Sequence, residues 1–122
     1  MVMILISQNI MFMLTVFGNP GMIPRNPNLH SAEYLKSIGD KEINGKICDK
    51  CQVIIPKGAK KVVHCDDCNV CVSNYDHHCV WCSKCIAGGN LYFFSCFLLL
   101  TVAGLLCFWF NLVSLLVFGI IQ

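Results

Sequence analysis

Residues 91–121 read LYFFSCFLLLTVAGLLCFWFNLVSLLVFGII, which is 31 consecutive residues without a charged side chain. About 20 apolar residues are enough for a helix to cross the ~30 Å hydrocarbon core of a bilayer. A helix that is apolar on all sides belongs in a membrane or deep inside a large protein, and a chain of 122 residues is too small for the second. We therefore predict a transmembrane α-helix over residues 91–121.

A second uncharged stretch, MVMILISQNIMFMLTVF, occupies residues 1–17 and contains four polar side chains. Its length is close to the lower limit for a helix that spans a membrane. A secretory signal peptide is the alternative, but the stretch has no basic start and no small-residue cleavage site before Asn19-Pro20-Gly21. We predict a second transmembrane helix over residues 1–17, truncated at its beginning.

Every charged side chain lies between Arg25 and Lys84, with nine Lys and Arg, seven Asp and Glu and a net charge of +2. Basic residues accumulate in the cytosolic loops of membrane proteins, so we expect this connecting segment to face the cytosol. The small net charge, and a sequence without a basic run interleaved with aromatics, exclude a nucleic-acid partner. Because cytosolic thiols stay reduced, the ten cysteines of the chain indicate metal binding or catalysis.

Proline and glycine after the first apolar stretch begin a linker, which we place in the cytosol at residues 18–47. A cysteine-rich module without helical or strand periodicity follows at residues 48–90. Asn90 occupies the N-cap position of the last helix. The predicted fold class is therefore a membrane protein in which two transmembrane helices flank a small, irregular cytosolic module.

Candidate metal ligands are concentrated in this module. It contains Cys48, Cys51, Cys65, Cys68, Cys71, Cys79, Cys82, Cys85, His64, His77 and His78. Two residues between paired cysteines allow both sulfurs to face one ion, and Zn²⁺ takes about four such ligands in a tetrahedron. Several pairs with interleaved histidines are a strong signal, and they predict a double-zinc module whose folding depends on the bound metal.

Eight cysteines and three histidines give 11 candidate ligands, and two closed zinc sites use eight of them. Spacing alone does not say which three remain. A spare thiol beside a spare imidazole is a nucleophile and its base. If residues 76–79 are extended, His77 and Cys79 share one face and His78 points the other way, which favours His78 as the ligand.

The motif Asp76-His77-His78-Cys79 resembles the signature of the DHHC-type protein S-acyltransferases, or palmitoyltransferases. The resemblance continues in Trp81, Cys85, Asn90 and Phe94, in the order of the upstream cysteines and His64, and in Asn19-Pro20-Gly21, which is similar to an Asp-Pro-Gly motif of the family. It covers the chain from Asn19 to Phe94 and extends loosely into the last helix.

The resemblance implies a role for each of these residues. It assigns one zinc ion to Cys48, Cys51, His64 and Cys71, and the other to Cys65, Cys68, His78 and Cys85. It makes Cys79 the nucleophile that carries the acyl group, His77 its base and Asp76 the group that orients His77. It places Trp81 near the start of the acyl chain, where an anchor at the membrane interface is the other reading. Cys82 is then the third spare residue and fills space.

The resemblance also implies the reaction and the partners. The acyl donor is a long-chain acyl-CoA such as palmitoyl-CoA, and the acceptors are membrane-proximal cysteines of substrate proteins. The protein is an integral component of the lipid bilayer, in Golgi or ER membranes, with its active site on the cytosolic face.

The chain departs from the family pattern in several places. Asn19 replaces an aspartate, Ala87 replaces a glycine, and the segment between Cys51 and His64 is longer and has no Pro-x-Arg element. The family has further membrane helices and a later Thr-Thr-x-Glu motif that this sequence does not contain. We therefore expect a partial chain, whose activity on its own is an open question.

Two alternatives use the same residues without catalysis. One is a membrane-anchored double-zinc module for protein interaction, similar in outline to RING or LIM domains. The other is an inactive acyltransferase remnant that only binds partners. A reactive free thiol beside an unliganded His77 distinguishes the enzyme from the interaction module.

Overall fold

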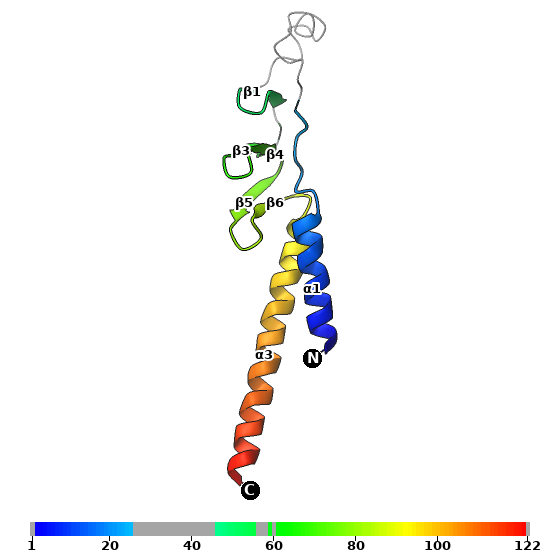
Figure 1. Ribbon diagram of the computed structural model, residues 1–122, viewed down its shortest axis with the longest axis vertical. Helices are drawn as coiled ribbons and strands as arrows, with labels where there is room; N and C mark the ends of the chain where they lie inside the picture. Colours follow the sequence, from blue (N-terminus) through cyan, green and yellow to red (C-terminus); the bar gives the residue numbers. More distant parts are fainter. Residues whose placement is uncertain (1, 26–45, 56–58, 60, 122) are drawn as a thin grey trace, which may run out of the picture.

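A computed structural model describes residues 2–25, 46–55, 59 and 61–121 of the chain. Two helices lie side by side, and three short β-hairpins are stacked beyond one end of the pair (Figure 1). Residues 26–45, most of the predicted linker at 18–47, lie outside the described residues. The order helix, cysteine-rich segment, helix is the one expected from the sequence.

The C-terminal helix α3 (Leu91–Ile121) has 31 residues, about 46 Å at a rise of ~1.5 Å per residue. Its segment Leu91–Gly119 is, among the described residues, the helix that is long and apolar enough to cross a membrane. Most of its large apolar side chains are exposed along its whole length, which suits a lipid environment. The expected helix over residues 91–121 is therefore present with the same bounds.

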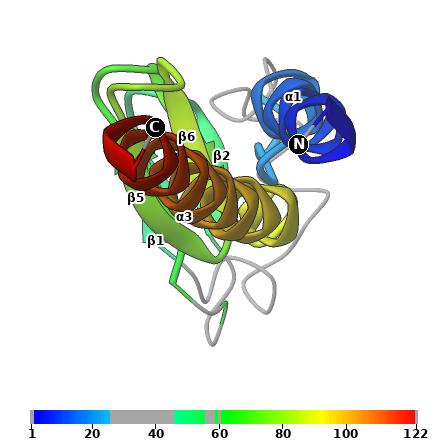
Figure 2. The ribbon, with the colours of Figure 1, turned by 90° about the horizontal axis from the view of Figure 1, so that it is seen from below.

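The N-terminal helix α1 (Val2–Phe17) has 16 residues and is apolar, but it is shorter than the ~20 residues of a typical membrane span. It packs along the first half of α3, where the Phe12 and Phe97 ring centroids are 5.3 Å apart. The Gln8 amide donates a hydrogen bond of 3.1 Å to the Thr101 hydroxyl. Figure 2 views the pair nearly end-on, with α1 beside α3.

Between the helices the chain forms three antiparallel two-stranded hairpins. They pair β1 (Lys46–Cys48) with β2 (Val53–Ile55), β3 (Val63–Cys65) with β4 (Val70–Val72), and β5 (Tyr75–Cys79) with β6 (Lys84–Ala87). The sequence predicts an irregular module here, and the structure corrects this prediction. Strands of three to five residues are too short to show a period of two in the sequence.

The segment after α1 attaches the helix to the hairpins. The Asn19 carboxamide oxygen accepts hydrogen bonds of 2.9 Å from the amides of Gly21 and Met22, which turns the chain. Met22 then forms an antiparallel bridge with Val72, and the Ile23 amide donates to the Cys71 carbonyl at 2.9 Å. The end of α1 is thereby joined to the edge of β4.

The interior of the hairpin stack is small and consists largely of thiols. Three buried clusters are present, formed by Cys65, Val72, Cys85 and Ala87, by Cys51, Val53 and Cys71, and by Cys79, Cys82 and Ile86. So little buried hydrocarbon contributes little hydrophobic free energy of folding.

Candidate active site and metal centres

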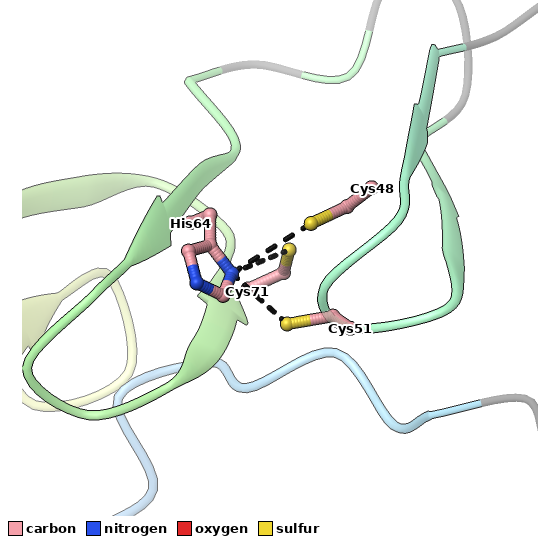
Figure 3. Close-up of side chains that lie close together, drawn as sticks. All are labelled: Cys48, Cys51, His64 and Cys71. Atoms are coloured by element: carbon pink, nitrogen blue, oxygen red, sulfur yellow. Dashed lines mark hydrogen bonds between the residues drawn. The ribbon is translucent and has the colours of Figure 1, made fainter.

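The first metal-ligating cluster joins two hairpins. Cys48, Cys51, His64 and Cys71 place their ligand atoms within 4.8 Å of one another. The His64 Nδ1 atom faces the three sulfurs (Figure 3) and lies 3.6 Å from Cys48 Sγ, 3.0 Å from Cys51 Sγ and 3.9 Å from Cys71 Sγ. In a tetrahedron with a metal–sulfur distance of ~2.3 Å and a metal–nitrogen distance of ~2.0 Å, the nitrogen and sulfur are ~3.5 Å apart.

The second cluster contains Cys65, Cys68, His78 and Cys85, again within 4.8 Å. The His78 Nδ1 atom lies 3.5 Å from Cys65 Sγ and 3.3 Å from Cys68 Sγ. The structure thus brings together the two ligand sets that the family resemblance implies. Both could hold a metal ion, and these are the two such groups that the described residues contain.

The β3–β4 hairpin serves both clusters because side chains alternate along a strand. His64 and Cys65 are neighbours on β3 and therefore point to opposite faces. His64 pairs in register with Cys71, its partner in the first cluster. Cys65 belongs to the second cluster, in which His78 on β5 pairs in register with Cys85 on β6.

The same alternation separates the two adjacent histidines of β5. His78 faces the second cluster, whereas the Phe94 ring packs against both the His77 ring and the buried cluster that contains Cys79. The His77 Nδ1 atom lies 3.1 Å from Asp76 Oδ2. The structure thus brings Asp76, His77 and Cys79 together, and Cys79 and His77 belong to neither metal cluster.

An irregularity in β5 allows Asp76 to meet its neighbour His77. The strand register shifts between Tyr75, which pairs with Ala87, and His77, which pairs with Ile86. Asp76 is therefore the extra residue of a β-bulge, and a bulge redirects side chains that otherwise point to opposite faces.

The Cys79 thiol lies where the hairpins meet the helices. It is 5% exposed and is buried with Cys82 and Ile86. Phe12 and Val16 of α1 and Phe94 of α3 pack against this cluster. The Phe94 ring also meets the His77 ring edge-on, with centroids 5.4 Å apart. Cys79 and His77 thus lie next to the ends of the two apolar helices.

The surroundings favour charge separation between Cys79 and His77. Burial raises the pKa of the Cys79 thiol, but hydrogen bonds from the Cys82 backbone and the His77 side chain outweigh it and lower the pKa. Burial lowers the pKa of His77, but hydrogen bonds with Asp76 and Cys79 outweigh it and raise the pKa. Both shifts favour a thiolate beside an imidazolium.

Trp81 and Cys82 lie between the paired strands of the β5–β6 hairpin. The side chain of Trp81 is 89% exposed at the tip of the β5–β6 hairpin. Cys82 is buried, as a space-filling residue would be, and it packs in one cluster with Cys79.

The sequence does not predict that Lys84 and Asn90 attach this hairpin to α1. The Lys84 ammonium donates to the Val16 carbonyl at 2.5 Å. The buried Asn90 amide donates to the Thr15 and Cys85 carbonyls at 3.2 and 3.0 Å, and its oxygen accepts from the Ala87 amide at 2.9 Å. Asn90 thus occupies the N-cap position of α3, but its side chain bonds to Thr15, Cys85 and Ala87 and not to the first amides of the helix. Contacts across 68 to 75 residues leave no local signal in a sequence.

The family model of the DHHC palmitoyltransferases matches residues 41–121. The chain therefore belongs to this family, which confirms the resemblance drawn from its motifs.

Curated relatives agree with this classification. The chain is 38% identical to "Probable protein S-acyltransferase 1" of Arabidopsis thaliana, in an alignment that covers 84% of this chain and 37% of the relative. It is 32% identical to "Palmitoyltransferase ERF2" of Candida glabrata, with 72% and 30% covered. It is 37% identical to "Palmitoyltransferase ZDHHC8" of Drosophila melanogaster, with 71% and 10% covered. The chain thus spans little more than a third of these relatives at most.

Proposed function

We propose that the protein is a protein S-palmitoyltransferase that moves a long-chain acyl group from acyl-CoA to cysteines of substrate proteins by way of Cys79. The observation that carries this proposal is the set formed by Cys79, His77 and Asp76, which lies outside both metal clusters and above the apolar helices. A purely structural double-zinc module has no use for such a set.

The first half of the reaction forms an acyl-enzyme. His77 accepts the proton of the Cys79 thiol, while Asp76 fixes the ring and stabilises the imidazolium. The Cys79 thiolate attacks the thioester carbonyl of acyl-CoA, and the carbon–sulfur bond to CoA breaks. The departing CoA thiolate takes a proton from the His77 imidazolium.

The second half of the reaction repeats these steps in reverse. Neutral His77 accepts the proton of a substrate cysteine, whose thiolate attacks the Cys79 thioester. The bond to Cys79 breaks, and the acyl group remains on the substrate protein. The Cys79 thiolate and the His77 imidazolium are then back in their starting state.

The two metal clusters fit Zn²⁺ by the chemistry of their donors. Each offers three thiols and one imidazole, a set that favours tetrahedral zinc. Without a cation, burial and hydrogen bonds with Cys48 and Cys51 raise the pKa of Cys71 to about 12, so metal binding must displace protons. Bound zinc holds the hairpins rigid on both sides of the active site, and we propose no chemical step at the metals.

The membrane explains where the acyl chain goes. The transfer of each methylene of such a chain from water into hydrocarbon is favourable by ~0.8 kcal/mol of free energy. We propose that α1 lies in the bilayer beside α3, with the hairpins on the cytosolic face and the chain directed along the helices. An apolar groove of about 350 Å³ between the helices, lined by Ile4, Gly104 and Phe108, supports this direction. By family resemblance we place the protein in Golgi or ER membranes.

Acylation of Cys79 tests the proposal. The full-length protein in membranes is incubated with a labelled long-chain acyl-CoA, and we expect a label on Cys79 that hydroxylamine releases. Cys79→Ser should abolish labelling, whereas the matched variant Cys96→Ser in α3 should leave it unchanged. A label that resists hydroxylamine, or that persists in Cys79→Ser, contradicts the proposed function.

A further inference from the structure

Three cysteine pairs of the module form the same kind of turn. Each consists of two cysteines separated by two residues and followed by a residue in the left-handed conformation. The pairs are Cys48–Cys51, Cys65–Cys68 and Cys79–Cys82, followed by Gln52 with φ 54°, Asn69 with φ 51° and Ser83 with φ 48°. In the first two turns, both sulfurs face a single metal cluster.

The third turn has no metal cluster among the described residues, yet its two thiols are also close together. Cys79 and Cys82 are both buried, and they pack in one cluster with Ile86. The proposed mechanism uses Cys79 and leaves Cys82 without a task. A thiol next to a nucleophilic thiol can form a disulfide bond with it.

The turn also has suitable dimensions for a bond between the two sulfurs. The Cys82 amide donates to the Cys79 carbonyl at 3.2 Å, the hydrogen bond that closes a β-turn. The Cα atoms at the two ends of a β-turn are less than ~7 Å apart, and a disulfide requires a separation of ~4.4–6.8 Å. Cys79 and Cys82 can therefore be joined without a change of fold.

We propose that Cys79 and Cys82 form a redox-active dithiol, which a hydroperoxide converts to an intramolecular disulfide that protects the nucleophile. The dithiol chemistry stands on the geometry of the turn. Its consequence, the reversible arrest of acyl transfer, rests on the proposed function.

The oxidation has two balanced steps. The Cys79 thiolate attacks one peroxide oxygen, the O–O bond breaks, and the second oxygen leaves as water after it takes a proton. This step gives a sulfenic acid on Cys79. The Cys82 sulfur then attacks the Cys79 sulfur, the S–O bond breaks, and the hydroxyl leaves as water with the Cys82 proton. Two thiols lose two electrons, and hydrogen peroxide becomes two waters.

Cys82 thereby determines whether oxidation can be reversed. A sulfenic acid with no thiol at hand is oxidised further to a sulfinic acid, which ordinary thiols do not reduce. A disulfide is reduced by a dithiol and returns both cysteines. The Cys82 thiol thus stops the oxidation of Cys79 at a state that thiols can reduce.

Disulfide mapping in the zinc-loaded, full-length protein tests this inference. After treatment with hydrogen peroxide, free thiols are blocked, the protein is digested, and peptides and bound zinc are measured. We expect a peptide that carries a Cys79–Cys82 disulfide, with both zinc ions retained. Acyl-enzyme formation should be lost and should return almost fully after addition of dithiothreitol.

Variants separate the dithiol from general oxidation. In Cys82→Ser, peroxide should convert Cys79 to a sulfinic acid, and dithiothreitol should no longer restore acyl-enzyme formation. Cys82→Val serves the same purpose if the serine variant loses zinc. The control Cys96→Ser should behave like the native protein. All activities are compared with the same variant before oxidation.

Three results would overturn the inference. They are a Cys79 oxidised without a bond to Cys82, a disulfide that includes a metal ligand and releases zinc, and a third zinc ion per chain bound at Cys79 and Cys82. If the disulfide forms but the untreated protein transfers no acyl group, the inference holds and the proposed function fails.

Discussion

His77 and His78 have the same side chain and successive positions, yet the structure gives them different environments. His78 Nδ1 lies 3.3 Å from a cluster thiol, whereas His77 contacts Asp76 and Cys79. Strand alternation predicts this division from the sequence. It does not predict the approach of Asp76 to His77, because that depends on a bulge set by pairing with β6.

Substitution of each histidine should therefore have a different effect. His78→Ala removes a ligand, so we expect bound zinc to fall from two ions to one and the module to aggregate. His77→Ala should retain both zinc ions and slow acyl-enzyme formation ~10²–10⁴-fold, the usual cost of a lost general base. Zinc analysis and single-turnover acylation on both variants check this.

The two readouts also show how the assignment would fail. Zinc loss in His77→Ala with zinc retained in His78→Ala would exchange the two roles. Unchanged acylation in both variants would remove His77 from the active site.

At the level of the elements, the β5–β6 hairpin is fastened to the end of α1. Lys84 pairs in register with Cys79, and its ammonium binds the Val16 carbonyl at 2.5 Å. The last carbonyls of a helix have no hydrogen-bond partner within the helix. Lys84 therefore satisfies a carbonyl of α1 and attaches to it the strand pair that carries Cys79.

We expect Lys84→Met to keep the packing of the side-chain stem and lose this bond. A hydrogen bond from a charged group contributes ~1.5–3 kcal/mol to stability, so we expect the free energy of unfolding to fall by up to that amount. Acyl-enzyme formation should fall at least ~10-fold because the thiol is less well positioned. Lys50→Met is the matched control, since the Lys50–Asp66 ion pair is exposed and such pairs contribute ~0–1 kcal/mol. Equal effects of the two substitutions would contradict a positioning role.

A close backbone approach makes Gly89 a second sensitive point of this junction. A Cβ atom at Gly89 would lie 2.2 Å from the Asn19 carbonyl oxygen and 3.0 Å from the Pro20 carbonyl carbon. Backbone atoms cannot move aside easily, so we expect Gly89→Ala to destabilise the module by ~1–3 kcal/mol. Gly119→Ala, where a Cβ meets open space, should be neutral in the same thermal unfolding experiment. Equal stability of the two variants would show that the close approach is relaxed.

The helix α3 can be predicted from the sequence, but the backbone conformation of the turns cannot. The long uncharged run predicts α3 and its bounds, and paired cysteines predict metal turns. The left-handed residues that end the two turns at the metal clusters are Gln52 and Asn69, and only asparagine favours that conformation by itself. We therefore expect the β1–β2 and β3–β4 turns to depend on metal binding more than on local conformational preference.

For the whole molecule, we expect stability to depend on lipid around the helices and on metal within the hairpins. Helix α3 is long and apolar enough to cross a bilayer, whereas the hairpins bury mainly cysteines. The sequence predicts this division because all charged residues and eight of the ten cysteines lie between the two uncharged stretches. It cannot predict how the parts join, because the junction consists of hydrogen bonds between distant residues such as Thr15 and Asn90.

Removal of metal should therefore separate the two parts. We expect two zinc ions per folded chain, and a strong chelator should unfold residues 46–87 while α1 and α3 stay helical. Circular dichroism should show most of its helical signal retained, while proteolysis should cut between the helices. A module that resists proteolysis after complete zinc removal would show that its apolar contacts suffice.

The order of the ligands along the chain has a consequence for synthesis. The first cluster is complete once Cys71 has left the ribosome, and the second closes with Cys85, five residues before Asn90. Chains emerge from their N-terminal end and fold as units while they grow. We therefore expect both metal ions to be captured while α3 is still inside the ribosomal tunnel, so that zinc supply would act on the protein before its last helix reaches the membrane.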